Sequence, residues 1–364
     1  MSDTDRRHMA HALSLGRRTM GRTWPNPAVG CVIVKDGRIL GRGWTQAGGR
    51  PHAETQALAQ AGDAARGATA YVTLEPCAHH GKTPPCADAL IAAGIARVVA
   101  PFEDSDARVA GQGFARLRAA GIEVTTGILA DAAGRDHQGF FLRVEQGRPM
   151  VTLKLASSFD GRIATASGES RWITGEVARR RVHLERLTHD AVLVGAGTAR
   201  ADDPSLTVRG MGAVSQPVRV VASRHLDLPL MSGLARTARD LPVWLCHGPD
   251  VPSATRATWK DLGATLLSVP VRGRQLDPAG LLQALGQAGL TRVYCEGGGQ
   301  LAATLLAADL VDELIGVTAG LALGAEGRPS LGAMGIGRLD EAPRFRLIET
   351  QDLGGDVLHR WARG

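Results

Sequence analysis

Three metal-binding side chains and one carboxylate lie within a single stretch of the chain, residues 51–86. His52 precedes Glu54 by two positions in Pro-His-Ala-Glu, and Cys77 and Cys86 follow in Glu-Pro-Cys and Pro-Pro-Cys. One imidazole and two thiolates make three ligands of a tetrahedral zinc, which leaves the fourth position open for water. A zinc of this kind lowers the pKa of its bound water to about 7. The pattern therefore predicts a catalytic zinc, with Glu54 carrying the proton of the water.

Other roles are compatible with the same side chains. A structural zinc has four ligands and usually C-x2-4-C spacing, whereas the second Cys here comes nine residues after the first. His79 and His80 are either rival ligands or solvent-facing loop residues. A disulfide between Cys77 and Cys86 would require an oxidising compartment, which nothing else in the chain indicates. The open, three-ligand site accounts best for the spacing.

The segments around these residues resemble a known family. They are Pro25 to Val34, His52-Ala53-Glu54, and Thr73 to Cys86. All three are similar to the deaminase half of the bifunctional riboflavin-biosynthesis deaminase/reductases, in which the Cys-to-Cys spacing is longer than the Pro-Cys-x-x-Cys of other zinc deaminases. The resemblance implies a cytidine-deaminase-like α/β/α zinc domain. It also favours a pyrimidine contact for Asn26, for which a turn-forming role is the alternative.

Composition and charge limit the classes of partner. The net charge is +6 and the pI near 9.4, but the basic residues are spread along the chain and aromatic residues make up only 4%. A nucleic-acid surface would need massed charge and stacking rings, so we expect no nucleic-acid partner. The basic excess fits a phosphorylated small molecule, with ordinary surface charge as the alternative.

The cellular compartment is predicted from the N-terminal residues, the length of the apolar runs and the cysteines. Residues 1–8 are polar and unlike a signal peptide, and no apolar run approaches the roughly 20 residues that span a bilayer. The five cysteines fit a reducing cytoplasm in which two are zinc ligands. Cys31, Cys246 and Cys295 each lie in an apolar run that is typical of a strand, so we expect buried, inert thiols.

Periodicity predicts two α/β domains, residues 1–146 and 147–364. In the first, the expected helices are residues 7–21, 52–61, 86–93, 113–120 and 131–146, and the expected strands 29–34, 39–44, 70–74, 97–100 and 122–124. In the second, the expected helices are 176–188, 281–289 and one after residue 300, and the expected strands 151–156, 191–198, 218–222, 243–246, 266–269, 292–295, 313–318, 344–349 and 354–360.

The strongest feature of the second half is Glu296-Gly297-Gly298-Gly299-Gln300 between a strand and a helix. Free backbone N–H groups and the helix dipole make such a turn an anion-binding cradle, although a tight turn without a ligand has the same pattern. Gly195-Ala196-Gly197 alone is a weak dinucleotide signal, because the third glycine of the Rossmann fingerprint is missing.

The second half resembles the reductase domain of the same family. The resemblance is carried by Leu153 to Arg162, Gly168 to Thr174, Asp202 to Arg209 and Glu296-Gly297-Gly298. It implies a dihydrofolate-reductase-like α/β domain, and with the first half it covers nearly the whole chain. The residues it implies for NADPH are Ala156, Trp172, Thr198, Asp202, Ser223, Gly298, Gly299, Gln300, Leu301, Ala302, Ala303 and Thr304. Those it implies for the substrate are Ser170, Arg186, Leu206, Arg209 and Glu296.

Physical chemistry supports these roles unevenly. Arg186 and Arg209 suit a phosphate through bidentate contacts, although Arg186 also fits a solvated helix face. Trp172 has a packing role as its alternative. Lys154 and Asp202 are candidates to polarise or protonate the substrate during reduction, with a strand-end ion pair as the other use.

Two consecutive reactions are what the resemblance implies. The first is zinc-dependent hydrolytic deamination of 2,5-diamino-6-(5-phosphoribosylamino)pyrimidin-4-one. The second is NADPH reduction of the ribosyl unit, which gives 5-amino-6-(5-phosphoribitylamino)uracil. The family also implies a cytoplasmic homo-oligomer without a membrane partner. Two other classes remain: a nucleic-acid-editing deaminase, which would lack the second domain, and a zinc-binding scaffold, in which Glu54 would have no function.

Overall fold

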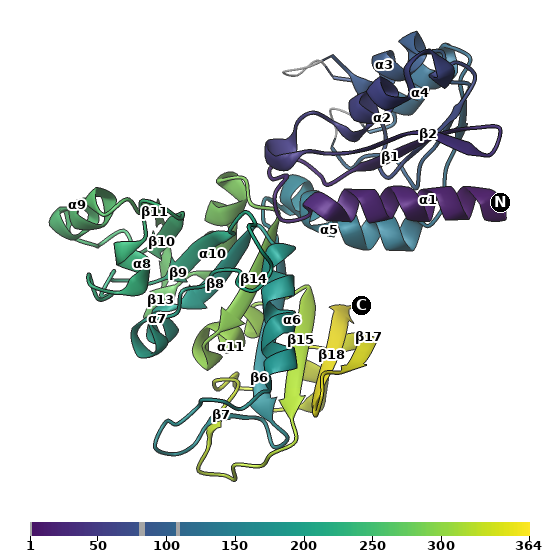
Figure 1. The fold of residues 1–364 in the computed structure, drawn as a ribbon. Helices are drawn as coiled ribbons and strands as arrows, with labels where there is room; N and C mark the ends of the chain where they lie inside the picture. The colour runs from purple at the N-terminus through teal and green to yellow at the C-terminus, as the bar shows by residue number, and fades with distance from the viewer. Residues whose placement is uncertain (1, 80–83, 107–109) are drawn as a thin grey trace. The chain divides into compact units, whose positions relative to one another are not determined.

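The computed structural model describes residues 2–79, 84–106 and 110–364. His80 lies outside the described residues. The chain divides into two compact units, Met1–Gly147 and Arg148–Gly364 (Figure 1). Each unit has its own β-sheet and its own apolar core.

The first unit is built on a five-stranded sheet. Its order is β2-β1-β3-β4-β5, with β1 antiparallel to both of its neighbours and β3, β4 and β5 parallel to one another. The strands are β1 (Gly30–Lys35), β2 (Arg38–Trp44), β3 (Thr69–Val72), β4 (Arg97–Val99) and β5 (Glu123–Thr125). Because β3 and β4 are parallel, the loops that follow them leave from the same edge of the sheet.

Helices cover both faces of this sheet (Figure 1). On one face lie α1 (Asp3–Gly16) and α5 (Ala130–Gln146); on the other lie α2 (Ala53–Ala61), α3 (Cys86–Ala92) and α4 (Gln112–Ala119). Alternation along β1 explains the two layers: Cys31 and Ile33 join the core under α2, while Val32 and Val34 join the core under α1. Short 3-10 turns at Arg17–Thr19, Ala47–Gly49 and Gly62–Ala65 complete the unit.

Two glycines of β2 allow α2 to lie directly against the sheet. A Cβ atom on Gly41 would come within 2.0 Å of the Ala57 carbonyl oxygen, and one on Gly43 within 2.0 Å of that of Ala53. No side chain fits between the strand and the helix at these points. This close approach fixes the first turn of α2, which carries the predicted His52 and Glu54.

The second unit contains a nine-stranded sheet. Its order is β11-β10-β9-β8-β14-β6-β15-β18-β17, parallel from β11 to β15 and antiparallel at β18 and β17. The strands are β6 (Met150–Ser158), β8 (Ala191–Gly195), β9 (Val218–Ala222), β10 (Val243–His247), β11 (Thr265–Ser268), β14 (Arg292–Gly297), β15 (Glu313–Ala319), β17 (Phe345–Asp352) and β18 (Asp356–Arg363). Two small ribbons pair β7 (Arg162–Ala164) with β16 (Arg328–Pro329), and β12 (Val271–Arg272) with β13 (Gln275–Leu276).

Helices and apolar clusters surround this sheet. The helices are α6 (Glu176–Leu187), α7 (Ala196–Asp202), α8 (Gly233–Arg236), α9 (Ser253–Asp261), α10 (Pro278–Gln287) and α11 (Gly299–Ala307), with a 3-10 turn at Leu339–Glu341. One core cluster joins Val194, Val221 and Leu245 to Trp259 of α9. A second, around Tyr294, joins residues of β15 and β18 to Ala178 of α6.

Strand order places a crevice between β8 and β14. From β8 the chain continues to β9 on one side, whereas from β14 it continues to β15 on the other side, beyond β6. The connections diverge, and ligands of open α/β sheets bind at such a point, outside the carboxyl ends of the strands. Helices α7 and α11 begin directly after these two ends.

Two differences between the expected elements and the structure are the largest or have an identifiable cause. The first helix begins at Asp3 rather than residue 7, because the Ser2 hydroxyl accepts a hydrogen bond from the Asp5 N–H and caps it. It ends at Gly16 rather than residue 21, and a 3-10 turn follows at Arg17–Thr19. The strand expected over 191–198 is wrong beyond Gly195, where α7 begins. The two glycines at 195 and 197 suggested a turn after an extended run, but the tertiary packing of Ala199 against the core stabilises a short helix there.

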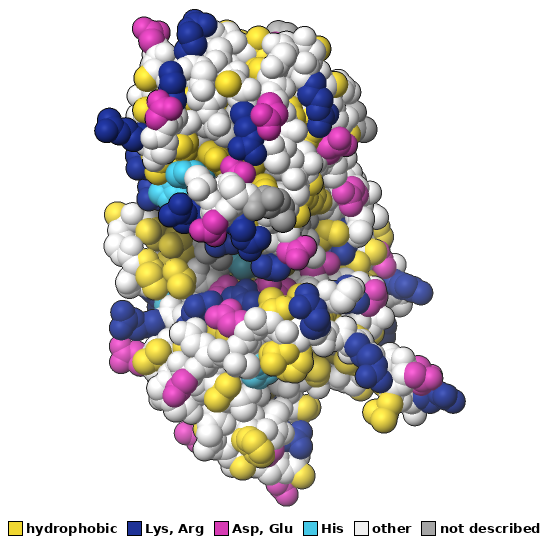
Figure 2. Space-filling view, turned by 90° about the vertical axis from the view of Figure 1, so that its right-hand side faces the viewer, with side chains coloured by type: hydrophobic (Ala, Val, Ile, Leu, Met, Phe, Trp, Pro, Cys, Tyr) yellow, Lys and Arg dark blue, Asp and Glu magenta, His cyan; other side chains and the backbone are white. Residues whose placement is uncertain are grey.

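Two other expectations concern the cysteines and the distribution of the basic residues. Cys31, Cys246 and Cys295 are buried and unpaired. On the face in Figure 2, Lys and Arg side chains are mixed with Asp and Glu rather than massed in one field. Among the described residues, no helix combines the length and the apolar character that crossing a bilayer requires.

Two candidate active sites

The first site assembles His52, Cys77 and Cys86 from three different segments. His52 is the N-cap residue of α2, Cys86 is the first residue of α3, and Cys77 lies in the loop after β3. His52 Nδ1 lies 3.3 Å from Cys86 Sγ and 3.8 Å from Cys77 Sγ. The three ligand atoms all lie within 4.8 Å of one another.

These distances fit a zinc ion. Ligand bonds of about 2.0 Å to nitrogen and 2.3 Å to sulfur at tetrahedral angles place a nitrogen and a sulfur about 3.5 Å apart. The two observed N–S separations, 3.3 and 3.8 Å, lie on either side of that value. Within the part of the chain that the structure describes, this is the one cluster of at least three His, Cys, Asp or Glu side chains with metal-binding spacing. The set holds three ligands, as an open site requires.

The protonation of the two thiols also suits a metal. Hydrogen bonds from the Cys86 thiol, His52 and the Cys86 backbone N–H outweigh burial and lower the pKa of Cys77. The same contact with Cys77, together with burial, raises the pKa of Cys86. A bound divalent cation would favour the thiolate form of both side chains, since cysteine ligands are thiolates.

Glu54 lies beside this cluster at the bottom of a cavity of about 580 Å³. Its carboxyl is 4% exposed, and burial and the neighbouring Cys77 raise its pKa although His52 opposes the shift. Asn26 lines the same cavity, with its side chain against Gly49. A buried carboxylate with a raised pKa next to a metal site is suited to carrying protons.

The cavity also contains residues that the sequence analysis missed. They are Arg50, Asp104, Asp106, Phe140 and Arg143. His79, considered above as a rival ligand, also lines the cavity but is not a member of the ligand cluster. Burial raises the pKa of Asp104 to about 6, and its Oδ1 accepts the Asp106 N–H at 2.9 Å. The available signal was topological: Cys77 and Asp104 follow the parallel strands β3 and β4, whose loops meet at one edge.

Glu75, next to the ligand loop, has an anchoring role. Its carboxylate accepts backbone N–H groups from Asp104 at 2.9 Å, Gly111 at 2.9 Å and Phe114 at 3.0 Å. The side chain is buried. It therefore holds the loop that brings Asp104 to the cavity.

The second site centres on an ion pair between Arg186 and Glu296. Arg186 Nε and Nη2 donate to the two carboxylate oxygens of Glu296 at 2.5 and 2.8 Å, and Nη1 donates to the Thr207 carbonyl at 2.6 Å. Burial alone would raise the pKa of Glu296, but the charge and hydrogen bonds of Arg186 outweigh it and lower that pKa. Each of the three guanidinium nitrogens of Arg186 thus donates one hydrogen bond to a protein group.

Lys154 lies beside this pair. The register between β6 and β14 sets Leu153 opposite Cys295, so Lys154, in the middle of β6, is a neighbour of Glu296 near the end of β14. Burial lowers the pKa of the Lys154 ammonium, and the Glu296 charge partly opposes this. A lysine with a lowered pKa next to a fixed carboxylate is a candidate proton donor.

The other residues predicted for the substrate and the cofactor differ in how far they are exposed. Leu206 has its side chain in the apolar core, whereas Ser170 and Arg209 are exposed, and the Arg209 N–H donates to His183 Nδ1 at 3.2 Å. Trp172 is 69% exposed, with the Arg179 guanidinium 4.4 Å from its ring centre. Ala156 is half-buried on β6 and Asp202 is exposed at the end of α7.

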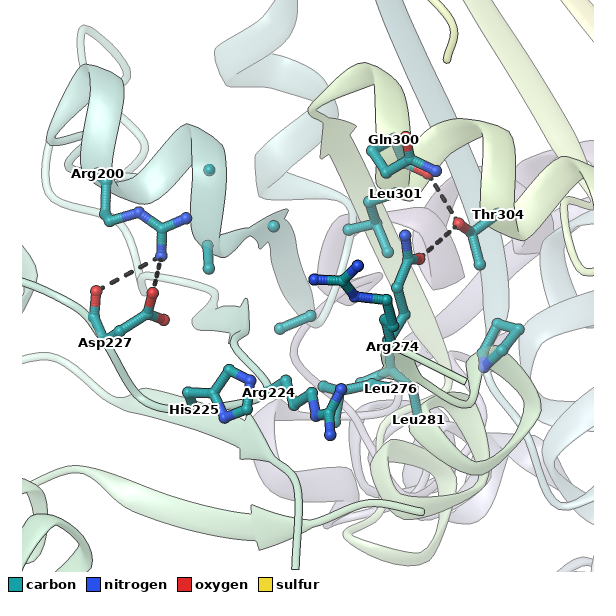
Figure 3. A pocket seen from close by; sticks show the side chains of 16 residues that line it. Arg200, Arg224, His225, Asp227, Arg274, Leu276, Leu281, Gln300, Leu301 and Thr304 are labelled. Carbon is teal, nitrogen blue, oxygen red and sulfur yellow. Dashed lines mark hydrogen bonds and ion pairs between the residues drawn. The ribbon is translucent and has the colours of Figure 1, made fainter. Parts of the chain in front are cut away.

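A pocket of about 330 Å³ opens at the β8/β14 crevice (Figure 3). Of the residues expected to contact the cofactor, Gln300, Leu301 and Thr304 of α11 line it, together with Gly195 and Ala196. The remaining predicted cofactor residues do not line it. Ser223 is buried behind the pocket, with its hydroxyl donating to Asp227 Oδ1 at 3.2 Å, and Ala302 and Ala303 have their side chains in the core.

The start of α11 fits a phosphate-bearing cofactor. Gly298 has φ +57°, and a Cβ atom there would lie 2.7 Å from Thr198 Oγ1. Glycine therefore keeps open the space between the strand end and α7. Among the residues that the structure describes, no side chain caps this helix, so its first N–H groups suit an anion such as a dinucleotide diphosphate.

Comparison with known proteins agrees with both sites. Residues 149–359 match the RibD C-terminal domain, and residues 2–101 match the cytidine and deoxycytidylate deaminase zinc-binding region. The chain is 44% identical over 362 residues to the riboflavin biosynthesis protein RibD of Escherichia coli (strain K12), covering 98% of each protein. The chain belongs to the RibD family.

Solved RibD structures share the fold. Form 2 of Acinetobacter baumannii RibD is 40% identical and superposes with a TM-score of 0.88 over 99% of each chain. A Thermotoga maritima protein described as a diaminohydroxyphosphoribosylaminopyrimidine deaminase/5-amino-6-(5-phosphoribosylamino)uracil reductase is 32% identical, with a TM-score of 0.86 and 99% coverage. RibD membership confirms the predicted fold class, a cytidine-deaminase-like domain followed by a dihydrofolate-reductase-like domain.

Proposed function

We propose that this RibD-family protein catalyses two consecutive steps of riboflavin biosynthesis, with one step in each unit. The observation that carries the proposal is the His52–Cys77–Cys86 cluster with Glu54 beside it, in a chain similar to RibD over 98% of its length. The substrate of the first step is 2,5-diamino-6-(5-phosphoribosylamino)pyrimidin-4-one. We assign deamination to residues 1–146 and reduction to residues 147–364.

In the first unit His52, Cys77 and Cys86 hold zinc, which when bound supplies a hydroxide nucleophile at neutral pH. Glu54 moves the protons: it takes one from the attacking water and delivers it to the ring nitrogen, then takes the second from the hydroxyl on the attacked carbon and delivers it to the departing amine, so that ammonia leaves and a carbonyl remains. Its burial keeps water from competing for these protons. Asn26 orients the pyrimidine, and the ring that remains is a uracil.

In the second unit NADPH, when bound, supplies the hydride that reduces C1′ of the sugar. Opening of the ribose ring breaks the C1′–O4′ bond, moves a proton to O4′ and leaves C1′ doubly bonded to nitrogen. Reduction at C1′ then requires a proton at that nitrogen. Lys154 is suited to provide it, because burial lowers its pKa and it lies close enough to Glu296 to feel that charge. Asp202, exposed at the end of α7, is less suited.

The ion pair changes the assignment of the substrate phosphate. Since Glu296 and the Thr207 carbonyl occupy the Arg186 guanidinium, we assign the phosphate to Arg209. Among the residues that the structure describes, none pairs with the Arg209 side chain. Arg186 then has the role of fixing Glu296, which faces the hydroxyl and N–H groups of the substrate. Ser170 completes the substrate contacts; Leu206 is 1% exposed with its side chain in the apolar core, so we assign it no contact.

The remaining predictions are cofactor contacts, assembly and compartment. We assign NADPH to Ala156, Trp172, Thr198, Asp202, Gly298, Gly299, Gln300, Leu301 and Thr304; Ser223, Ala302 and Ala303 are buried, so we assign them no contact. A homo-oligomer and a cytoplasmic location follow from the resemblance.

A single assay tests the two-step proposal. Zinc-replete protein is given the phosphoribosyl diaminopyrimidine and NADPH, while ammonia release and NADPH absorbance are followed together. We expect ammonia first and NADPH loss second, in equal amounts. Ammonia without NADPH loss would contradict the reductase assignment. The absence of both ammonia release and NADPH loss would contradict both assignments.

A further inference from the structure

The pocket at the β8/β14 crevice is lined by more positively than negatively charged side chains. Arg200, Arg224, His225 and Arg274 line it, and Asp227 is the one acidic lining residue (Figure 3). Asp227 is already used, since Arg200 Nη1 donates to its Oδ2 at 2.7 Å and the Ser223 hydroxyl to its Oδ1 at 3.2 Å. The described residues contain no hydrogen-bonding or ionic partner for the Arg224 or Arg274 guanidinium. Two positive charges therefore remain uncompensated.

These two arginines reach the pocket from different elements. Arg224 follows the end of β9, and Arg274 lies in the turn of the β12–β13 ribbon (Figure 3). The ribbon is tied to α11, because the Thr304 hydroxyl donates to Gln275 Oε1 at 3.1 Å or to the Gln300 carbonyl at 2.8 Å. Arg274 is thus held next to the helix that begins at the glycine cradle.

The position of Arg224 indicates which anion it meets. In dinucleotide-binding sheets the diphosphate lies at the helix N-terminus, and the end of the neighbouring strand faces the adenosine ribose. An acidic residue there bonds the 2′-hydroxyl, whereas an arginine accommodates a 2′-phosphate. Here α11, after β14, supplies the helix N-terminus, and β9, which lies beyond β8 from β14, is followed by Ser223 and Arg224; Arg224 and residues of α11 line the same pocket. Arginine pairs bind dianionic phosphates through charge-assisted hydrogen bonds.

We propose that Arg224 and Arg274 together bind the 2′-phosphate on the adenosine ribose of the cofactor, and so determine its preference for NADPH over NADH. The proposal rests on the proposed reductase function and adds the residues that select the cofactor. The diphosphate remains with the start of α11, so a cofactor without the 2′-phosphate still finds its other contacts.

The test measures nucleotide binding rather than turnover. Dissociation constants of NADPH, NADH, 2′,5′-ADP and 5′-AMP are determined by calorimetry for the full chain and for Arg224→Gln and Arg274→Gln. Hydrogen bonds to a charged group contribute about 1.5–3 kcal/mol, so each substitution should weaken NADPH and 2′,5′-ADP by about 10- to 100-fold. Binding of NADH and 5′-AMP should change less than about threefold, because neither nucleotide carries the 2′-phosphate that the two arginines bind.

Arg272→Gln is the matched control. Arg272 lies on the same ribbon and is exposed, but it does not line the pocket. It removes the same charge, and NADPH binding should stay within about twofold of the original. Thermal unfolding of each variant establishes that it is folded.

Two other results would overturn the proposal in different ways. A parallel loss of NADPH and NADH binding would mean that the arginines hold the diphosphate, and would leave the reductase function intact. Failure of the unmodified, folded protein to bind any of the four nucleotides would contradict the reductase function itself.

Discussion

The zinc ligands of the first unit lie between His52 and Cys86, whereas the residues of the second site come from strand ends and loops between Lys154 and Thr304. The first site holds its side chains by the close packing of α2 on β2, where Gly41 and Gly43 leave no space. The second depends on a buried ion pair that joins α6 to β14. A metal site is thus set by ligand identity and spacing, and a nucleotide site by topology.

The largest expected effect separates the two chemistries. Glu54→Gln keeps the size of the side chain but removes the proton carrier, so ammonia release should fall by about 10³-fold. Zinc content should be unchanged, because Glu54 is not among the three ligands. NADPH oxidation with pre-deaminated substrate should also be unchanged. The measurements are ammonia release, metal content and NADPH absorbance on one preparation; loss of both activities would contradict separate sites.

The second effect concerns stability and should be confined to the second unit. Glu296→Gln leaves Arg186 buried without a charge partner, which costs about 3 kcal/mol of unfolding free energy. Urea unfolding of the full chain, with zinc content as the readout for the first unit, measures it. Asp340→Asn is the control, since the Arg338–Asp340 pair is exposed and should contribute nothing measurable. Equal losses for both variants would show that the pair has no special role.

A third substitution should reverse the pattern of Glu54→Gln. Lys154→Met removes the proposed proton donor while keeping most of the apolar stem, and should lower the rate of NADPH oxidation by about 10²-fold. Ammonia release should be unchanged. The measurement is the steady-state rate of each reaction with saturating substrate. An unchanged reduction rate would move proton donation to another group, such as Asp202.

Prediction from sequence succeeded where local chemistry carries the information. The three ligands and Glu54 were found by residue type and spacing, and the structure brings the ligands together. The Arg186–Glu296 pair was not foreseen, because its members are 110 positions apart and a sequence contains no distances. The same holds for Asp104, which reaches the zinc cavity because Glu75 anchors its loop.

Short elements were missed for a different reason. The β7, β12, β13 and β16 strands have two or three residues, too few for a period-2 pattern to be seen. Arg274 in the β12–β13 turn therefore had no predicted place, although it lines the pocket. By contrast, strand β14, the glycine turn after it and the helix that follows were predicted, since an apolar run that ends in three glycines is a strong local signal.

The smallest expected effect is acid sensitivity of the second unit. His189 is fully buried; its Nδ1–H donates to the Glu185 carbonyl at 2.7 Å, and Nε2 accepts from the Thr152 hydroxyl at 3.0 Å. Burial, assisted by the charges of Arg292 and Arg360, lowers its pKa to about 3. The unfolded chain, with a pKa near 6.5, binds the proton first. Stability from neutral His189 is therefore present above about pH 6.5 and is lost as the pH falls toward 3.

Between pH 7 and pH 5 this loss amounts to about 2 kcal/mol. Hydrogen exchange of the β6 and β14 amides, corrected for intrinsic rates, reports the opening free energy of the second unit alone. His189→Gln should remove most of the slope between these two pH values. A slope that survives in the variant would assign the acid sensitivity to other groups.

The central claim is that two independent sites act in sequence, and a transfer experiment tests it most directly. The Lys154→Met variant first deaminates the substrate, and the protein is removed by filtration. The filtrate is then given to the Glu54→Gln variant with NADPH. We predict NADPH loss equal to the ammonia released in the first stage. If Glu54→Gln fails to oxidise NADPH while the unmodified protein does so with the same filtrate, the two sites are not independent and the account is wrong.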